Sequence, residues 1–183
     1  EQKTATPPSQ AAVSQTVPQY SAETFFNTTT LYGSSLSHDG SAVLVTSDAS
    51  GIFNVYRYPV DGSAPTQLTQ STSDAYNGIS WFPKDDRFLY TADQGGNELN
   101  HGYVQLPDGS SKDLTPGDKL KAQMVGWHQD DVHFFIMTNE RDNRFFDLYQ
   151  YSSADYSRSM LFENNTGFNL EAVSPNGRYL ALS

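Results

Sequence analysis

The sequence of 183 residues contains no cysteine. A disulfide framework and a thiolate nucleophile are therefore excluded. Positive charge is also scarce, because 11 Lys and Arg residues stand against 21 Asp and Glu residues and give a formal net charge of −10. Nucleic acids and anionic membranes are bound through basic surfaces, so this balance argues against both as partners. No apolar run approaches the about 20 residues that a membrane-spanning helix needs, so the sequence predicts no membrane span.

The first 19 residues lack aromatic side chains and are rich in Pro, Gln, Ser, Thr and Ala. Such a segment cannot bury enough apolar surface to fold, so we expect residues 1–19 to form a disordered leader or linker. The chain begins with Glu1, and a cleaved export signal followed by such a leader would give this start. A boundary introduced by cloning would give it equally well. We favour export, which predicts a periplasmic or secreted protein.

A hairpin pattern recurs four times in the rest of the chain. Each copy has a turn of polar residues followed by an apolar run, and the copies read LSHDGSAVLV at 36–45, FPKDDRFLY at 82–90, WHQDDVHFFI at 127–136 and VSPNGRYLAL at 173–182. The second turn residue falls at Gly40, Asp86, Asp131 and Gly177, in steps of 46, 45 and 46 residues. A fixed step of this size indicates a repeat architecture.

The remainder of each unit repeats as well. A third apolar stretch carries an aromatic residue in every copy, at Tyr56, Tyr103 and Tyr149, and two copies close on the same Leu-Thr pair, at 68–69 and 114–115. Four short strands joined by Asp, Gly, Asn, Ser and Pro turns are typical of a β-propeller blade. The sequence therefore predicts an all-β fold, a partial β-propeller of three four-stranded blades plus the start of a fourth.

We place this incomplete propeller at residues 20–183. Its blades are expected at about 34–79, 80–125 and 126–171, with a partial blade at 172–183, and Phe25, Phe26 and Tyr32 are expected to dock on the first blade. A propeller usually closes with 4–8 blades, and an open one exposes blade faces and strand edges. We therefore expect the chain to be the N-terminal piece of a longer protein. A small propeller completed by self-association is the lesser alternative.

A search for chemistry assigns no catalytic residue. Ser37, His38 and Asp39 are consecutive, so their side chains point in different directions and do not predict a triad. A G-x-S-x-G nucleophile motif is absent from the sequence. The histidines at 38, 101, 128 and 133 lack the spacing of paired zinc ligands, and the calcium-loop pattern is missing. The sequence therefore predicts neither a metal site nor a cofactor, and structural or surface roles for all four histidines.

Charged residues gather in corresponding loops of neighbouring units. They are Glu98, Glu140, Arg141, Asp142 and Arg144. Loops at one end of a propeller carry function in many members of the fold. These side chains either line a mouth or form ion pairs between blades, and we favour the ion pairs. Glu98, Glu140 and Arg141 are nevertheless the candidates for substrate binding.

Several strings resemble one family more specifically. They are DDRFLYTADQGGNELNHGYV at 85–104, LTPG at 114–117, TNERDNRFFDLYQY at 138–151 and VSPNGRYLALS at 173–183. Together they resemble the N-terminal propeller of prolyl-oligopeptidase-family serine peptidases, above all the bacterial dipeptidyl- and acylaminoacyl-peptidase-like members. The blade repeat is also similar to that of TolB-like propellers. The resemblance covers about residues 20–183.

The resemblance implies that the propeller and the catalytic domain have separate functions. In such peptidases the propeller caps a C-terminal α/β-hydrolase domain that holds the nucleophilic Ser, the Asp and the His, and none of these can be assigned to this sequence. The propeller would then act as a substrate gate and docking surface, with peptide substrates and the C-terminal remainder of the same protein as partners. Some members hold the amino terminus of the substrate with acidic propeller residues, but no motif here assigns that role.

Three functions stay open on the sequence. The leading hypothesis is the propeller segment of an exported serine peptidase that hydrolyses short peptides, with no activity in this chain alone. The alternative is a non-enzymatic TolB-like propeller that binds a protein or peptide. A sialidase- or glycosidase-type propeller has the weakest support, because Gly40 lacks the aromatic residue that an Asp-box places shortly after its glycine.

Overall fold

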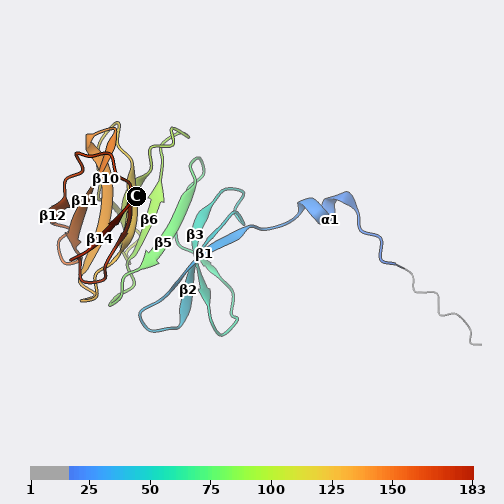
Figure 1. The fold of residues 1–183 in the computed structure, drawn as a ribbon. Coiled ribbons are helices and arrows are strands. Elements are labelled where there is room, and N and C mark those ends of the chain that lie inside the picture. The colour runs from blue at the N-terminus through green and yellow to red at the C-terminus, as the bar shows by residue number, and fades with distance from the viewer. Residues whose placement is uncertain (1–16) are drawn as a thin grey trace, which may run out of the picture.

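The computed structural model describes residues 17–183. Most of the predicted leader, residues 1–16, lies outside the described part. A single short helix, α1 (Ala22–Phe26), precedes the strands and stands away from the sheets (Figure 1). Phe25 and Phe26 are 68% and 84% exposed, so they do not dock on the first blade as expected. Tyr32 does, because its ring packs edge-on against Phe53 at 5.2 Å.

Fourteen strands follow α1 and form four antiparallel sheets. The first sheet contains β1 (Leu31–Leu36), β2 (Ala42–Ser47), β3 (Asn54–Pro59) and β4 (Thr66–Gln67). The second contains β5 (Tyr76–Trp81), β6 (Phe88–Ala92), β7 (His101–Gln105) and β8 (Ser111–Asp113). The third contains β9 (Ala122–Trp127), β10 (His133–Asp142), β11 (Phe145–Ser152) and β12 (Arg158–Phe162), and the fourth only β13 (Leu170–Val173) and β14 (Leu180–Leu182).

This arrangement confirms the predicted partial propeller. Each complete sheet is a meander in which consecutive strands are neighbours, and the sheets stand side by side in chain order (Figure 1). The first strands of adjacent sheets touch, β1 against β5 and β9 against β13. Among residues 17–183, no helix has the length and apolar character needed to cross a membrane.

The sheets and the repeat units of the sequence have different starting points. The expected unit boundaries at 34, 80, 126 and 172 fall inside β1, β5, β9 and β13. A period of 46 residues fixes the distance between equivalent positions but not the strand at which a sheet begins. The first strand of each sheet therefore precedes the hairpin turn that marks the repeat.

Aromatic side chains fill the contact between the second and third sheets. Phe82, Phe134 and Tyr151 are at most 1% exposed, and the ring of Phe134 lies 5.3 Å from that of Tyr151 and 5.9 Å from that of Phe82. Trp127 adds a ring 4.9 Å from Phe82. Burial of such rings supplies most of the free energy that holds two sheets face to face.

Gly78 on β5 brings the first two sheets close together. A Cβ atom at this position would lie 3.0 Å from Cγ1 of Val55, on the buried face of β3. The backbone N–H of Gly78 also donates to Oγ1 of Thr46 at 2.9 Å, and Thr46 is fully buried. The absence of a side chain therefore permits a hydrogen bond directly between two blades.

The repeated Leu-Thr pair has one structural role in both copies. The threonine hydroxyl accepts the backbone N–H of the third strand, from Val55 to Thr69 at 2.8 Å and from Gly102 to Thr115 at 2.9 Å. The leucine N–H donates to the carbonyl of the same residue, Val55 in the first blade and Gly102 in the second, at 2.8 Å in each. The pair thus continues the sheet ladder beyond the short fourth strand.

This role predicts the effect of Thr115→Val. The substitution keeps the shape but leaves the buried N–H of Gly102 without an acceptor, which costs about 1–3 kcal/mol. Urea unfolding is expected to show this loss for Thr115→Val and a much smaller loss for Thr115→Ser, which retains the hydroxyl. Thr66→Val on the exposed face of β4 is the control. Equal stabilities of the Thr115→Val and Thr66→Val variants would contradict the role.

Candidate functional site

Antiparallel strands divide the turns of each sheet between two ends. We call the end with the β2–β3, β6–β7 and β10–β11 loops (48–53, 93–100 and 143–144) and the links between sheets (68–75, 114–121 and 163–169) the connector end. The opposite end, with the β1–β2, β5–β6, β9–β10 and β13–β14 turns, is the turn end. All charged candidates of the sequence lie at or beside the connector end.

Arg141 and Asp147 form the centre of the candidate site. Asp147 follows the start of β11 and is completely buried, and its carboxylate accepts hydrogen bonds from Nε and Nη2 of Arg141 at 2.7 and 2.9 Å. The backbone N–H of Asn164 donates to the same carboxylate at 2.7 Å. These contacts with Asp147 raise the pKa of Arg141. The link to the fourth sheet is therefore tied to β10 through one buried carboxylate.

The position of Asp147 is filled by a buried polar residue in each of the three complete blades. Asn54 and His101 precede the repeated tyrosine by two residues, as Asp147 does, and all three are buried. The amide oxygen of Asn54 accepts the backbone N–H of Ser71 at 2.8 Å, just as Asp147 accepts that of Asn164. In the first and third blades the polar side chain at this position therefore binds the link that leads to the next blade, whereas in the second blade Nδ1 of His101 contacts the Asp113 carboxylate on β8 at 2.8 Å.

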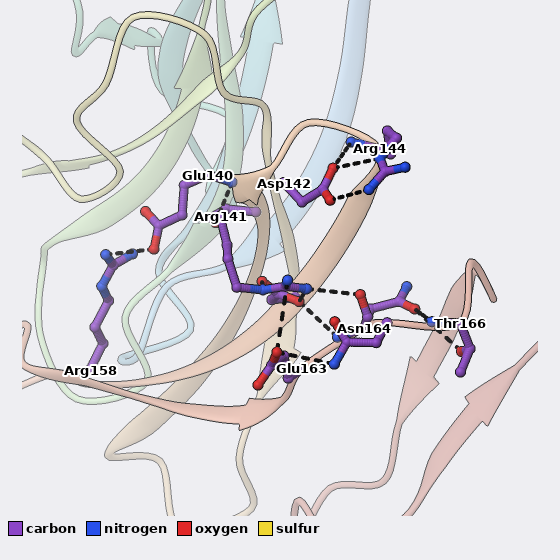
Figure 2. A network of polar contacts seen from close by, with 11 residues as sticks. Glu140, Arg141, Asp142, Arg144, Arg158, Glu163, Asn164 and Thr166 are labelled. Atoms are coloured by element: carbon purple, nitrogen blue, oxygen red, sulfur yellow. Dashed lines mark hydrogen bonds and ion pairs between the residues drawn. The ribbon is translucent and has the colours of Figure 1, made fainter.

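Glu140 belongs to a second ion pair on the other side of the loop. Its Oε1 lies 2.8 Å from Nη2 of Arg158, and the Arg158 guanidinium lies over the ring of Tyr149 at 4.6 Å (Figure 2). Burial, reinforced by a hydrogen bond with Glu140, raises the pKa of Tyr149 to about 12. Arg158 and Arg141 point away from each other, so Glu140 and Arg141 have separate partners (Figure 2).

The Asp142–Arg144 pair is independent of the other two. The carboxylate of Asp142 accepts hydrogen bonds from the backbone N–H, Nε and Nη2 of Arg144, the last at 2.7 Å. These bonds lower the pKa of Asp142. The side chain of Arg144 is 72% exposed, so this pair closes the β10–β11 loop at the surface (Figure 2).

Glu98 is not brought to these ion pairs. It lies in the β6–β7 loop with a positive φ of 59°, and its backbone N–H donates to the carboxylate of Asp93 at 2.9 Å. Glu98 is exposed, and within residues 17–183 its side chain makes no hydrogen bond or ion pair. The structure therefore places Glu98 at the connector end but joins only Glu140 and Arg141 to a charged network.

A hollow of about 400 Å³ lies near this network along the first strands of the second and third sheets. Ile79, Met124 and Phe146 form its apolar part, and Asn100 and Lys121 add polar groups. The backbone of Lys121 is paired with Asn139, the residue before Glu140. The hollow is large enough for a short peptide and combines apolar walls with a few polar atoms, as ligand sites commonly do.

A second hollow of about 350 Å³ lies at the turn end, between the first two sheets. Arg57, Trp81 and Asp86 are among the residues that line it. The indole N–H of buried Trp81 has no hydrogen-bond partner within the described chain, whereas that of Trp127, one blade further, donates to Oγ of Ser80 at 2.9 Å. This Trp81 N–H is closed off from solvent, so the groups that the hollow offers to a ligand are the guanidinium of Arg57 and the carboxylate of Asp86.

The structure also gathers groups that the sequence spacing did not indicate. His128, Asp130 and His133 come together in the β9–β10 turn. The residues are two and three positions apart, a separation that only the curvature of the turn converts into contact.

Comparison with known proteins supplies the family context. The chain is 33% identical over 135 residues to dipeptidyl aminopeptidase BIII of Pseudoxanthomonas mexicana, a stretch that covers 71% of this chain and 19% of the peptidase. The chain is homologous to part of a dipeptidyl aminopeptidase. This finding confirms the resemblance to peptidase propellers stated above. A scan against protein-family models finds no match.

Solved structures confirm the propeller fold. TolB of Acinetobacter baumannii superimposes with a TM-score of 0.60 at 17% identity, over 84% of this chain and 37% of TolB. A prolyl endopeptidase superimposes with a TM-score of 0.62 at 16% identity, over 82% of this chain and 24% of the endopeptidase. The chain thus spans about a fifth of its dipeptidyl aminopeptidase homologue, about a quarter of the prolyl endopeptidase and just over a third of TolB.

Proposed function

We propose that this chain is the N-terminal propeller part of a prolyl-oligopeptidase-family serine peptidase that hydrolyses short peptides. The observation that carries the proposal is the homology to a dipeptidyl aminopeptidase, of which the matched stretch is only 19%. The propeller serves as substrate gate and docking surface for an α/β-hydrolase domain that lies outside residues 1–183. Export to the periplasm or beyond the cell is part of the same proposal.

Glu140 is the group that recognises the free amino terminus of the peptide. Its ion pair with Arg158 engages Oε1 and fixes the side chain, which is 21% exposed. A carboxylate held in one position by a second charge binds an ammonium group at little further entropic cost. The apolar wall of the nearby hollow, at Met124 and Phe146, offers a surface for the first side chains of the substrate.

This role predicts a change in substrate affinity for Glu140→Gln in the longer protein that carries the chain. The variant keeps the shape but loses the charge that pairs with the substrate ammonium, so KM for a peptide with a free amino terminus is expected to rise about 10-fold, as for a lost charged hydrogen bond. Hydrolysis of the same peptide with an acetylated amino terminus is expected to be unaffected.

Asp155→Asn, which removes an exposed carboxylate at the turn end, is the matched control and is expected to leave KM unchanged. An unchanged KM in Glu140→Gln would reject the role of Glu140 but not the peptidase. Failure of the longer protein to hydrolyse any short peptide would reject the peptidase itself.

The second candidate function is a non-enzymatic TolB-like propeller that binds a protein or peptide. The hollow at the turn end supports it, because the guanidinium of Arg57 can donate to peptide carbonyl groups and the carboxylate of Asp86 can accept peptide N–H groups. Peptide binding that is lost in Arg57→Gln, in a longer protein without hydrolytic activity, would favour this function. Glycosidase-type chemistry gains no support from the described residues.

A further inference from the structure

The β9–β10 turn carries three metal-ligating side chains in contact with one another. Nδ1 of His128 lies 3.0 Å from Oδ2 of Asp130, and Nδ1 of His133 lies 2.7 Å from the same oxygen. All three ligand atoms lie within 4.8 Å of one another. We propose that His128, Asp130 and His133 bind a divalent transition-metal ion such as Zn²⁺ at the turn end of the third blade.

The separations suit a shared ion. Ligand atoms about 2.1 Å from a metal lie roughly 3.0 Å apart when they occupy neighbouring octahedral positions and about 3.4 Å apart in a tetrahedron. The two distances to Asp130 are therefore close to the octahedral value and require only a small outward movement of the imidazole rings for tetrahedral binding. The movement is possible because His133 is 34% exposed.

The carboxylate is already oriented. The other oxygen of Asp130, Oδ1, accepts the backbone N–H groups of Val132 and His133 at 2.8 and 3.0 Å. Oδ2 is thereby directed towards the two imidazoles. Hydrogen bonds that fix a ligand in this way raise metal affinity, because less freedom is lost when the ion binds.

The backbone of the turn also orients the His128 ring. The backbone N–H of Asp130 lies 3.2 Å from Nδ1 of His128, and the same nitrogen lies 3.0 Å from Oδ2 of Asp130. A neutral imidazole that accepts this N–H has its lone pair on Nδ1, which is the form in which histidine binds a metal ion.

The turn does not require histidine for its own stability. In the equivalent β1–β2 turn, Oγ of Ser37 donates to Asp39 at 2.7 Å, and in the β13–β14 turn Oγ of Ser174 contacts Oδ1 of Asn176 at 2.8 Å. A hydroxyl therefore closes the same turn in two other blades. Only the third blade combines two imidazoles with the carboxylate within the described chain.

The ligand set selects the class of metal. Two imidazoles and one carboxylate favour Zn²⁺, Ni²⁺, Co²⁺ or Cu²⁺ over the oxygen-seeking Ca²⁺ and Mg²⁺. Side-chain exposures of 18%, 36% and 34% leave one side of the site to solvent, so water would complete the coordination. Such an ion would fasten β9 to β10 where the third blade meets the β13–β14 turn, since Gln129 N–H donates to the carbonyl of Pro175 at 2.7 Å.

The test is calorimetric titration of the untagged 183-residue chain with ZnCl₂. One saturable site is expected, and His133→Gln and His128→Gln are each expected to weaken it by at least about 10-fold, the effect of losing even an indirect ligand contact. His38→Gln is the matched control, because His38 faces a single carboxylate, that of Asp86 at 3.5 Å, in an equivalent turn. It is expected to bind Zn²⁺ like the parent chain.

A thermal melt with and without Zn²⁺ shows whether each variant is folded and whether the ion stabilises it. The parent chain and His38→Gln are expected to melt at higher temperature with Zn²⁺, whereas folded His133→Gln is not. Absence of saturable binding to the parent chain, unchanged affinity in both His133→Gln and His128→Gln, or an equal loss in His38→Gln would each overturn the proposal.

Discussion

Phe134→Ala is expected to lower the free energy of unfolding by about 3–5 kcal/mol. Phe134 is fully buried, and its ring is surrounded by those of Phe82, Trp127 and Tyr151 at centroid distances of 5.9, 5.2 and 5.3 Å. Because these neighbours come from two sheets and are held by their own strands, they cannot close the cavity left by the ring. The loss is measured by urea unfolding followed through tryptophan fluorescence.

Two further variants test whether this loss comes from the buried volume of the Phe134 ring. Phe134→Leu keeps most of the buried volume, so we expect a cost of about 1–2 kcal/mol. Phe168→Ala removes the same side chain from a residue that is 52% exposed, and we expect a change within about 0.5 kcal/mol. If Phe134→Ala were as mild as Phe168→Ala, the aromatic contact would not be what joins the second and third blades.

Asp147→Ala is expected to cost about 3 kcal/mol, the sum of a charged hydrogen-bonding group lost and a buried N–H left unpaired. Asp147 is completely buried and accepts the guanidinium of Arg141 and the N–H of Asn164. Urea unfolding measures the loss. Asp142→Ala, five positions earlier, removes the contacts with the backbone and guanidinium of Arg144 at the surface and is expected to cost less than about 1 kcal/mol.

The repeat suggests a partial rescue. In the first blade Asn54 fills the position of Asp147 and accepts the backbone N–H of Ser71. Asp147→Asn is therefore expected to recover the bond to Asn164 but not the charge pair with Arg141, which places its stability between those of the parent chain and Asp147→Ala. A cost for Asp147→Asn as large as that for Asp147→Ala would contradict the equivalence of the two positions.

The sequence predicts the fold well because the repeat is visible in turn residues. Gly40, Asp131 and Gly177 adopt positive φ of 70°, 57° and 68°, so the residue at this step reflects a backbone requirement in three of the four turns, whereas Asp86 in the second blade does not share it. The strand at which each sheet begins could not be predicted, because the repeat gives the spacing between equivalent residues but does not show which strand comes first in a sheet.

The charged site could be predicted only in part. Loop position identified Glu140 and Arg141, but their ion pairs join strands of the third sheet and do not run between blades as expected. Their partners Asp147, Arg158 and Asn164 were missed because they lie 6 to 23 residues away on other strands and links. Asp147 carried a signal that could have been used, since it stands two residues before the repeated Tyr149, where Asn54 precedes Tyr56.

Docking of Phe25 and Phe26 on the first blade is a further expectation that the structure contradicts. The pair Phe25–Phe26 suggested an apolar face, but a helix of five residues cannot hold itself in place without a partner surface. In the structure Tyr20 and Phe25 pack only on each other, edge to face at 6.2 Å. Two adjacent aromatic residues therefore do not by themselves predict where a terminal segment binds.

Covalent labelling with a fluorophosphonate probe tests most directly whether the reacting serine lies outside this propeller. The probe reacts with a serine only where a neighbouring base activates its hydroxyl. The 183-residue chain is expected to remain unlabelled, and the longer protein is expected to carry one adduct on a serine beyond the propeller, located by mass spectrometry of the digest. An adduct on any serine within residues 1–183, or no adduct on the longer protein, would contradict the proposed peptidase.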